Sequence, residues 1–119
     1  GQSTTTITTK TQNLLFTTKM VSLFSKDAAN VVKFKAEGGK LTLTANTSEV
    51  GQNVADVEAK IEGQDLQVAF NSKYLLDVLA IIGSEEVTLG FTGPLNPGVI
   101  KPVGKDNYLY IIMPVRVAM

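Results

Sequence analysis

The sequence predicts an α+β domain in which two helices pack on one face of an antiparallel sheet. Three observations support this fold class: short runs alternate apolar with polar residues, two stretches carry apolar residues at helical spacing, and the order of elements repeats. Each half is expected to contain one strand, one helix and a meander of three strands. Because strands outnumber helices and short turns join neighbouring strands, both helices should cover the same face.

The first half begins with a strand over 4–9, where β-branched threonine and isoleucine favour extended backbone. Thr11 offers an N-cap for a helix that is expected to run to Ser25. Its apolar side is predicted to be Leu14, Leu15, Met20, Val21, Leu23 and Phe24, and its polar side Gln12, Lys19, Ser22 and Lys26. This pattern is typical of an amphipathic helix with one side buried against a sheet.

Period-two alternation follows and predicts a meander. Residues 32–36 and 41–45 form two strands joined at Gly38-Gly39, a hairpin turn. Residues 46–51 are expected to be a looser connection, and 56–62 a further strand with a charged outer face. The strand at 66–70 then opens the second half.

The helix after 66–70 is the most apolar segment of the chain. Asn71 or Ser72 can cap it, and Gly83 ends it. Its apolar residues are Leu75, Leu76, Val78, Leu79, Ile81 and Ile82, more than a helix surrounded by solvent needs. Strands are expected at 87–91, near 99–100 and at 108–115, and Pro114 indicates a sheet edge or the end of pairing because it lacks an amide donor.

Composition limits the possible functions. A chain of 119 residues with 44% hydrophobic content forms one domain, and 11 basic residues balance 11 acidic ones. This balance argues against a free-standing nucleic-acid binder held by bulk charge, although it permits a locally basic face. No apolar run approaches the ~20 residues of a membrane span, so a soluble protein without a membrane partner is expected. Gly1-Gln2-Ser3 are interpreted as a cloning remnant.

Catalysis has few candidate residues, because the chain lacks histidine and cysteine. Glu85 and Glu86 are adjacent on a strand and point to opposite faces. Asp56, Glu58 and Glu62 share a face with Lys60 among them, which is typical of a solvated strand face. We therefore expect no catalytic residue, no metal site and no cofactor.

Two groups of residues could instead bind partners. Lys19, Lys26 and Lys73 could form a basic patch on the two helices, or simply be solvated. Three lysines alone would bind DNA weakly, because affinity grows with the number of phosphates neutralised. Leu23 and Phe24 are neighbours at a helix end and cannot both face one core, so core packing and a partner contact both remain open.

Several motifs resemble the last domain of the bacterial sliding clamp, the beta subunit of DNA polymerase III. In the second half they are 70–79, Glu85-Glu86-Val87-Thr88-Leu89, 92–97 and Tyr108-Leu109-Tyr110-Ile111-Ile112-Met113-Pro114-Val115-Arg116. In the first half Leu14-Leu15, Leu23-Phe24-Ser25 and 41–46 are similar as well. The combination of Phe-Asn-x-x-Tyr-Leu-Leu with Met-Pro-Val-Arg is specific, and the resemblance covers the whole chain but only one of the family's three domains.

The resemblance implies a DNA-clamp fold and a non-enzymatic replication processivity factor. In that family two protomers close into a ring whose helices surround double-stranded DNA and whose sheets form the outer surface. Lys19, Lys26 and Lys73 would face DNA, and Leu23 and Phe24 would lie at the interface between the two protomers of a homodimer. The protein would be bacterial, cytoplasmic and nucleoid-associated.

The resemblance also implies a groove for short linear peptides from polymerases, the clamp loader and repair proteins. This domain's side of the groove would consist of Tyr74, Leu95, Pro97, Met113, Pro114, Val115 and Arg116. The alternative is a stand-alone clamp-fold interaction module that does not act on DNA. Two preceding domains of the same repeat in the full-length gene would favour the clamp.

Overall fold

The computed structural model describes residues 4–22, 31–47, 51–104 and 109–115. These residues form two helices and nine strands. In chain order the elements are β1 (Thr5–Lys10), α1 (Thr11–Ser22), β2 (Val31–Glu37), β3 (Lys40–Thr47), β4 (Gly51–Val57), β5 (Ala59–Gly63), β6 (Leu66–Asn71), α2 (Ser72–Ile81), β7 (Glu86–Phe91), β8 (Gly98–Pro102) and β9 (Tyr110–Ile112). The α+β class is therefore confirmed.

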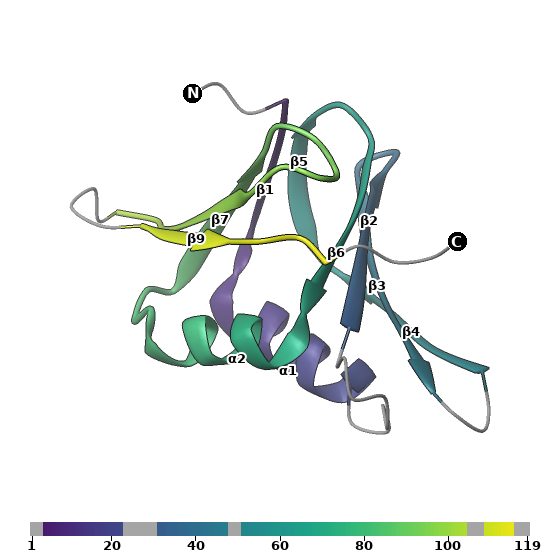
Figure 1. The fold of residues 1–119 in the computed structure, drawn as a ribbon. Helices are drawn as coiled ribbons and strands as arrows, with labels where there is room; N and C mark the ends of the chain where they lie inside the picture. Colours follow the sequence, from purple (N-terminus) through teal and green to yellow (C-terminus); the bar gives the residue numbers. More distant parts are fainter. Residues whose placement is uncertain (1–3, 23–30, 48–50, 105–108, 116–119) are drawn as a thin grey trace.

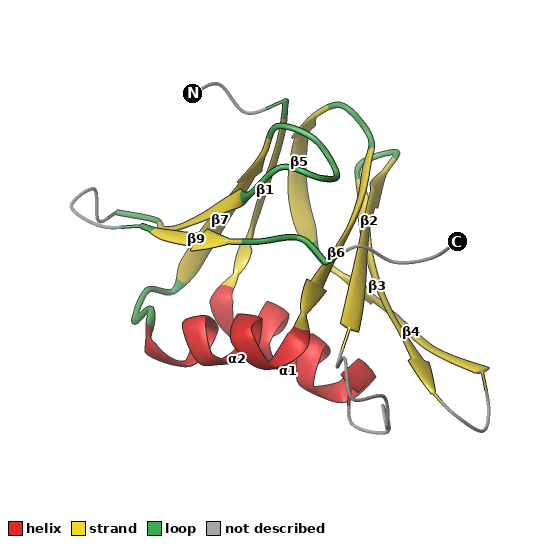
Figure 2. Ribbon diagram, in the orientation of Figure 1, coloured by secondary structure: helices red, strands yellow, loops and turns green. Residues whose placement is uncertain are grey.

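The strands divide into two antiparallel sheets, whereas the sequence suggested one. The orders are β5-β1-β7-β8-β9 and β4-β3-β2-β6. Figure 1 shows the two sheets spreading apart above a floor made by α1 and α2, which lie beside each other. Figure 2 shows the same separation, with both helices together at one end of the molecule.

The division into two sheets occurs at Glu58, inside the segment 56–62 that was predicted as one strand. Residues before Glu58 pair with β3, whereas Ala59 pairs with Thr9 of β1. The Thr9 hydroxyl donates to the Glu58 carbonyl at 2.7 Å, which satisfies the backbone at the crossing. The alternation of side chains continues through Glu58, but the pairing partner changes there from β3 to β1. One continuous run of alternating residues thus supplies an edge strand to each sheet.

Phenylalanine rings join the two sheets inside the core. Phe34 of β2 and Phe70 of β6 meet edge to face, with ring centroids 5.5 Å apart, and Phe70 stacks on Phe91 of β7 at 5.7 Å. All three side chains are essentially inaccessible to solvent. Their spacing lies within the range for favourable aromatic pairs, so the contact between the sheets is specific as well as apolar.

The helices bury a narrower stripe than was predicted. In α1 the buried stripe is Thr11, Leu14, Thr17, Thr18 and Val21, and in α2 it includes Leu75, Val78 and Leu79. Met20 and Ile81, which were assigned to the apolar sides, are 45% and 68% exposed. Helical spacing puts positions i, i+3, i+4 and i+7 on one side. Three threonines therefore occupy buried positions of α1 that counting apolar residues missed.

Two boundaries also differ from expectation. The looser connection predicted at 46–51 is wrong, because β3 continues to Thr47 and β4 begins at Gly51, which pairs with Thr47. Polar Gln52 and Asn53 hid this strand from the alternation pattern. At the other end, the strand predicted at 108–115 is shorter, since β9 ends at Ile112 before Pro114. Among the described residues, no helix is long and apolar enough to cross a membrane.

Candidate functional site

The segment after β9 leaves one sheet and reaches the other. β9 is the edge strand of the five-stranded sheet, and the Val115 amide donates to the carbonyl of Ala69 in β6, in the four-stranded sheet, at 2.7 Å. Figure 1 shows the yellow C-terminal segment crossing above α2 toward β6. We call residues 113–115 the tail. Pro114 has no amide to continue the β8–β9 ladder, so the tail is free to turn toward β6.

Tyr74 fastens the start of α2 to this segment. The Asn71 side chain caps α2 by accepting a hydrogen bond from the Tyr74 amide at 3.1 Å, which settles the two capping options in favour of Asn71. The Tyr74 hydroxyl then donates to the carbonyl of Ile111 at 3.1 Å. The tail is therefore held on both sides, by Tyr74 just before it and by Ala69 at its end.

The loop between β7 and β8 reaches the same place. Gly98 pairs with Ile112, so residues 92–97 end beside Met113. A Cβ atom on Gly98 would lie 2.6 Å from Cε1 of Phe91 and 3.2 Å from Cγ2 of Ile112. Glycine at this position therefore allows the start of β8 to pack closely against Phe91 and Ile112.

Apolar groups surround the tail and remain accessible. Tyr74 is 45% exposed, Leu95 62% and Met113 63%, while Pro97 is exposed and Pro114 and Val115 are half-buried. Five of the seven residues predicted for the peptide groove lie on or beside the tail: Tyr74 through its bond to Ile111, Pro97 through the pairing of β8 with β9, and Met113, Pro114 and Val115 as the tail itself. Leu95 lies in the exposed loop 92–97, and Arg116 lies outside the described residues. Large exposed apolar side chains around hydrogen-bonded backbone suit contact with an apolar peptide.

The predicted basic patch is described only in part. Lys19 in the last turn of α1 and Lys73 in the first turn of α2 are both exposed. Lys26 lies outside the described residues, as do Leu23 and Phe24 of the predicted interface between protomers. A lysine near a helix C-terminus is favoured by the helix dipole, whereas one in the first turn is disfavoured. Lys73 therefore gains nothing from the dipole of α2.

The acidic residues of the charged strand face do not converge. Asp56, Glu58 and Glu62 are exposed, and Asp56 forms an ion pair with Lys40 at 3.0 Å. The hydrogen bond from Lys40 lowers the pKa of Asp56 below its usual value, and the Thr42 hydroxyl adds to this effect. Within the described residues, no group of three acidic side chains is placed to hold a metal ion.

Sequence reasoning did not find the backbone groups that fix the tail. The carbonyls of Ile111 and Ala69 carry no side-chain signal, and this region was indicated only by the motifs at Tyr74, at 92–97 and at the Met-Pro-Val-Arg ending. It also missed a hollow between the start of α1 and the end of α2, because those residues are far apart in the chain.

Comparisons with known proteins agree on one family. The family model of the C-terminal domain of the DNA polymerase III beta subunit matches residues 1–116. A beta sliding clamp from Chlamydia muridarum is 36% identical over 105 residues, which is 88% of this chain and 28% of that protein. One from Staphylococcus aureus is 34% identical over 97 residues, 80% of this chain and 26% of that protein.

Solved structures give the same result. The beta subunit of DNA polymerase III from Thermotoga maritima matches with a TM-score of 0.92 and 33% identity, covering 98% of this chain and 32% of that one. The Bacillus subtilis sliding clamp matches at 0.90 and 31%, with the same coverage. The chain therefore spans about a third or less of the length of these relatives.

Proposed function

Because the chain belongs to the family formed by the C-terminal domain of the DNA polymerase III beta subunit, we propose that it serves as that domain in a bacterial replication processivity clamp. It catalyses no reaction. It contributes two helices to a homodimeric ring around double-stranded DNA and one side of a groove for peptides of polymerases, the clamp loader and repair proteins. The protein acts in the cytoplasm, at the nucleoid.

The tail and its surroundings support the peptide-binding part of this proposal. Hydrogen bonds at Ile111 and Val115 hold the tail before any peptide arrives, so less conformational entropy is lost on binding. Leu95 and Met113 then offer apolar surface to a peptide side chain. Tyr74, Pro97, Pro114, Val115 and Arg116 complete this side of the groove. The anchoring of the tail by Tyr74 is the single observation that carries the proposal.

The helix pair supports the DNA-facing part. α1 and α2 lie together at one end of the fold, with Lys19 and Lys73 exposed (Figure 2). Lys19, Lys26 and Lys73 touch phosphates without reading bases, as expected for a clamp that must slide. Several domains around one hole supply the phosphate contacts that a single domain lacks. Leu23 and Phe24 contact the neighbouring protomer.

Peptide binding to single-site variants tests the groove. A fluorescent peptide with a glutamine followed by a short apolar pair is titrated with the chain, and anisotropy is measured. Leu95→Ala and Met113→Ala should each weaken binding by about tenfold, since each removes apolar surface worth ~1–2 kcal/mol. Val103→Ala is the matched control, because Val103 is a comparably exposed apolar residue in the connection between β8 and β9 that lies away from the tail. Equal affinity for all four proteins would reject the groove.

Salt dependence tests the DNA-facing lysines. In the full-length clamp, Lys19→Glu and Lys73→Glu should each weaken retention on circular DNA and reduce the slope of log affinity against log salt by about one. Lys101→Glu is the control, because Lys101 is an exposed lysine on strand β8. An identical effect from Lys101→Glu would show that overall charge, and not the helix face, retains the clamp.

A further inference from the structure

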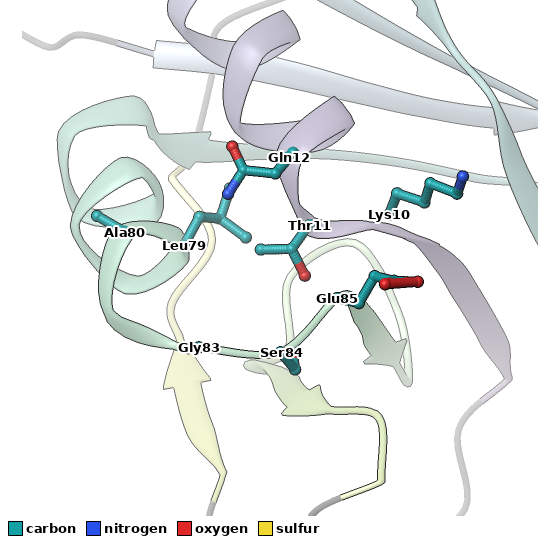
Figure 3. A pocket seen from close by; sticks show the side chains of 8 residues that line it. All are labelled: Lys10, Thr11, Gln12, Leu79, Ala80, Gly83, Ser84 and Glu85. Carbon is teal, nitrogen blue, oxygen red and sulfur yellow. The ribbon is translucent and has the colours of Figure 1, made fainter.

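A hollow of about 460 Å³ lies where the chain enters α1 and leaves α2. Lys10, Thr11 and Gln12 form one wall, and Leu79, Ser84 and Glu85 lie on the other side (Figure 3). The volume is in the range of small-ligand sites. It involves none of the residues around the tail and none of the three lysines considered above.

The Thr11 side chain is the unusual feature of this hollow. It is 2% exposed, and its hydroxyl has no hydrogen-bond partner among the described residues. Figure 3 shows the oxygen directed toward the segment that carries Ser84 and Glu85. Buried hydroxyl groups are nearly always bonded, so an unbonded one beside a cavity indicates a missing partner.

The start of α1 supplies further donors. The Thr11 amide donates to the Glu85 carbonyl at 2.9 Å. The next two amides, of Gln12 and Asn13, have no partner within the helix, and the structure gives them no capping side chain among the described residues. The first turn of this 12-residue helix contains no acidic residue. Its positive end therefore favours an anion.

The charges around the hollow limit where an anion can sit. Lys10 and Glu85 cancel in formal charge, and Figure 3 shows both side chains extending to one side, away from Leu79. The last turn of α2 contributes the opposite wall, and its carbonyl end disfavours an anion. The favourable position is therefore next to Thr11 and the first-turn amides of α1.

We propose that this hollow binds a phosphate oxyanion, with the Thr11 hydroxyl and the first-turn amides of α1 donating to its oxygens. The phosphate belongs either to a DNA backbone or to a free phosphate or nucleotide. The Ser84 hydroxyl already donates to the Glu86 carbonyl at 2.7 Å, so it supplies no donor. The site needs neither the ring nor the peptide groove.

Amide chemical shifts of the labelled chain test this site directly. Inorganic phosphate replaces chloride stepwise during the titration, at constant pH and constant ionic strength. Saturable shifts at Gln12, Asn13 and Glu85 are expected. Thr11→Val should weaken binding by about tenfold, because one donor to a charged oxygen is lost, and Thr11→Ser should bind like the original chain. Glu85→Gln should bind about fivefold more tightly, since a like charge is removed.

A stability measurement separates binding from folding. Since the Thr11 hydroxyl has no protein partner among the described residues, Thr11→Val should unfold at the same or a higher urea concentration than the original chain. Thr18→Val is the matched control, because Thr18 is equally buried and unpartnered in the described part of the structure but does not line the hollow. It should leave phosphate binding unchanged. Lower stability of Thr11→Val with unchanged phosphate binding would overturn the proposal.

A second titration identifies the source of the phosphate. Shifts at the same amides with a short DNA duplex, reversed by inorganic phosphate, assign the site to the DNA backbone. Shifts with inorganic phosphate and none with the duplex assign it to free phosphate or a nucleotide. The absence of saturable shifts with both probes refutes the site. The peptide titration is independent of this result, so the groove and the phosphate site can fail separately.

Discussion

Replacing Tyr74 with phenylalanine removes one hydroxyl and keeps the ring. That hydroxyl donates to the Ile111 carbonyl at 3.1 Å, just before the tail. The Tyr74 side chain is 45% exposed and its ring is retained, so the packing of the hydrophobic core does not change. The change therefore tests whether Tyr74 holds the tail, which is the feature on which the proposed groove depends.

The expected effect is local and small. A hydrogen bond of this kind contributes ~0.5–1 kcal/mol net, the lower part of the usual range because water competes at an exposed site. Since ~1.4 kcal/mol corresponds to a factor of ten in an equilibrium, the open population of the tail should rise between about twofold and fivefold. The free energy of global unfolding should fall by no more than this ~0.5–1 kcal/mol.

Hydrogen exchange measures this opening directly. The Val115 amide, bonded to Ala69, should exchange about two to five times faster in Tyr74→Phe than in the original chain. Leu95→Ala is the control variant, because it removes no hydrogen bond, and it should leave exchange at Val115 unchanged. Unchanged exchange at Val115 in Tyr74→Phe, or equal acceleration in Leu95→Ala, would refute the role given to Tyr74.

Three further changes have defined outcomes. Gly98→Ala should lower the unfolding free energy by ~1–3 kcal/mol in urea, because the new methyl would meet Phe91; unchanged stability would contradict this packing. Since Lys40 lowers the folded-state pKa of Asp56, the ion pair stabilises the fold above the ordinary carboxyl pKa, and this contribution is lost as pH falls through the folded-state pKa. In thermal melts, Asp56→Asn should therefore lose less stability than the original chain as the pH falls through the acid range. An equal loss of stability in both proteins would contradict the contribution of the ion pair. Asn71→Ala should destabilise the chain by ~1 kcal/mol through loss of the α2 cap, measured by urea unfolding; a neutral effect would reject the cap.

The fold class could be predicted from the sequence because apolar side chains recur at a different spacing in helices and in strands. Alternation located most strands, and the apolar run after Asn71 located α2. The same reasoning failed at Glu58, where the chain changes sheets without a change in alternation. It also failed at Gln52 and Asn53, whose polar side chains lie on an edge strand and give no apolar signal.

The candidate site was predictable in its side chains and not in its geometry. Tyr74, Leu95 and Met113 were chosen through a resemblance. The structure links Tyr74 to the strand that leads into Met113 through the backbone carbonyl of Ile111, a contact that residue identity does not predict. Thr11 was expected to cap α1, yet it is the first helical residue, and its hydroxyl is unbonded within the described residues. A capping prediction needs the local dihedral angles, which residue identity alone does not determine.

The most direct test of the central claim is a titration of the labelled chain with a clamp-binding peptide, followed by amide chemical shifts. The account predicts saturable shifts confined to Tyr74, to the loop at Leu95 and to the tail from Met113 to Val115. Shifts that saturate elsewhere, for example on the outer face of the four-stranded sheet, or no shifts at millimolar peptide, would contradict a preformed half-groove in this domain.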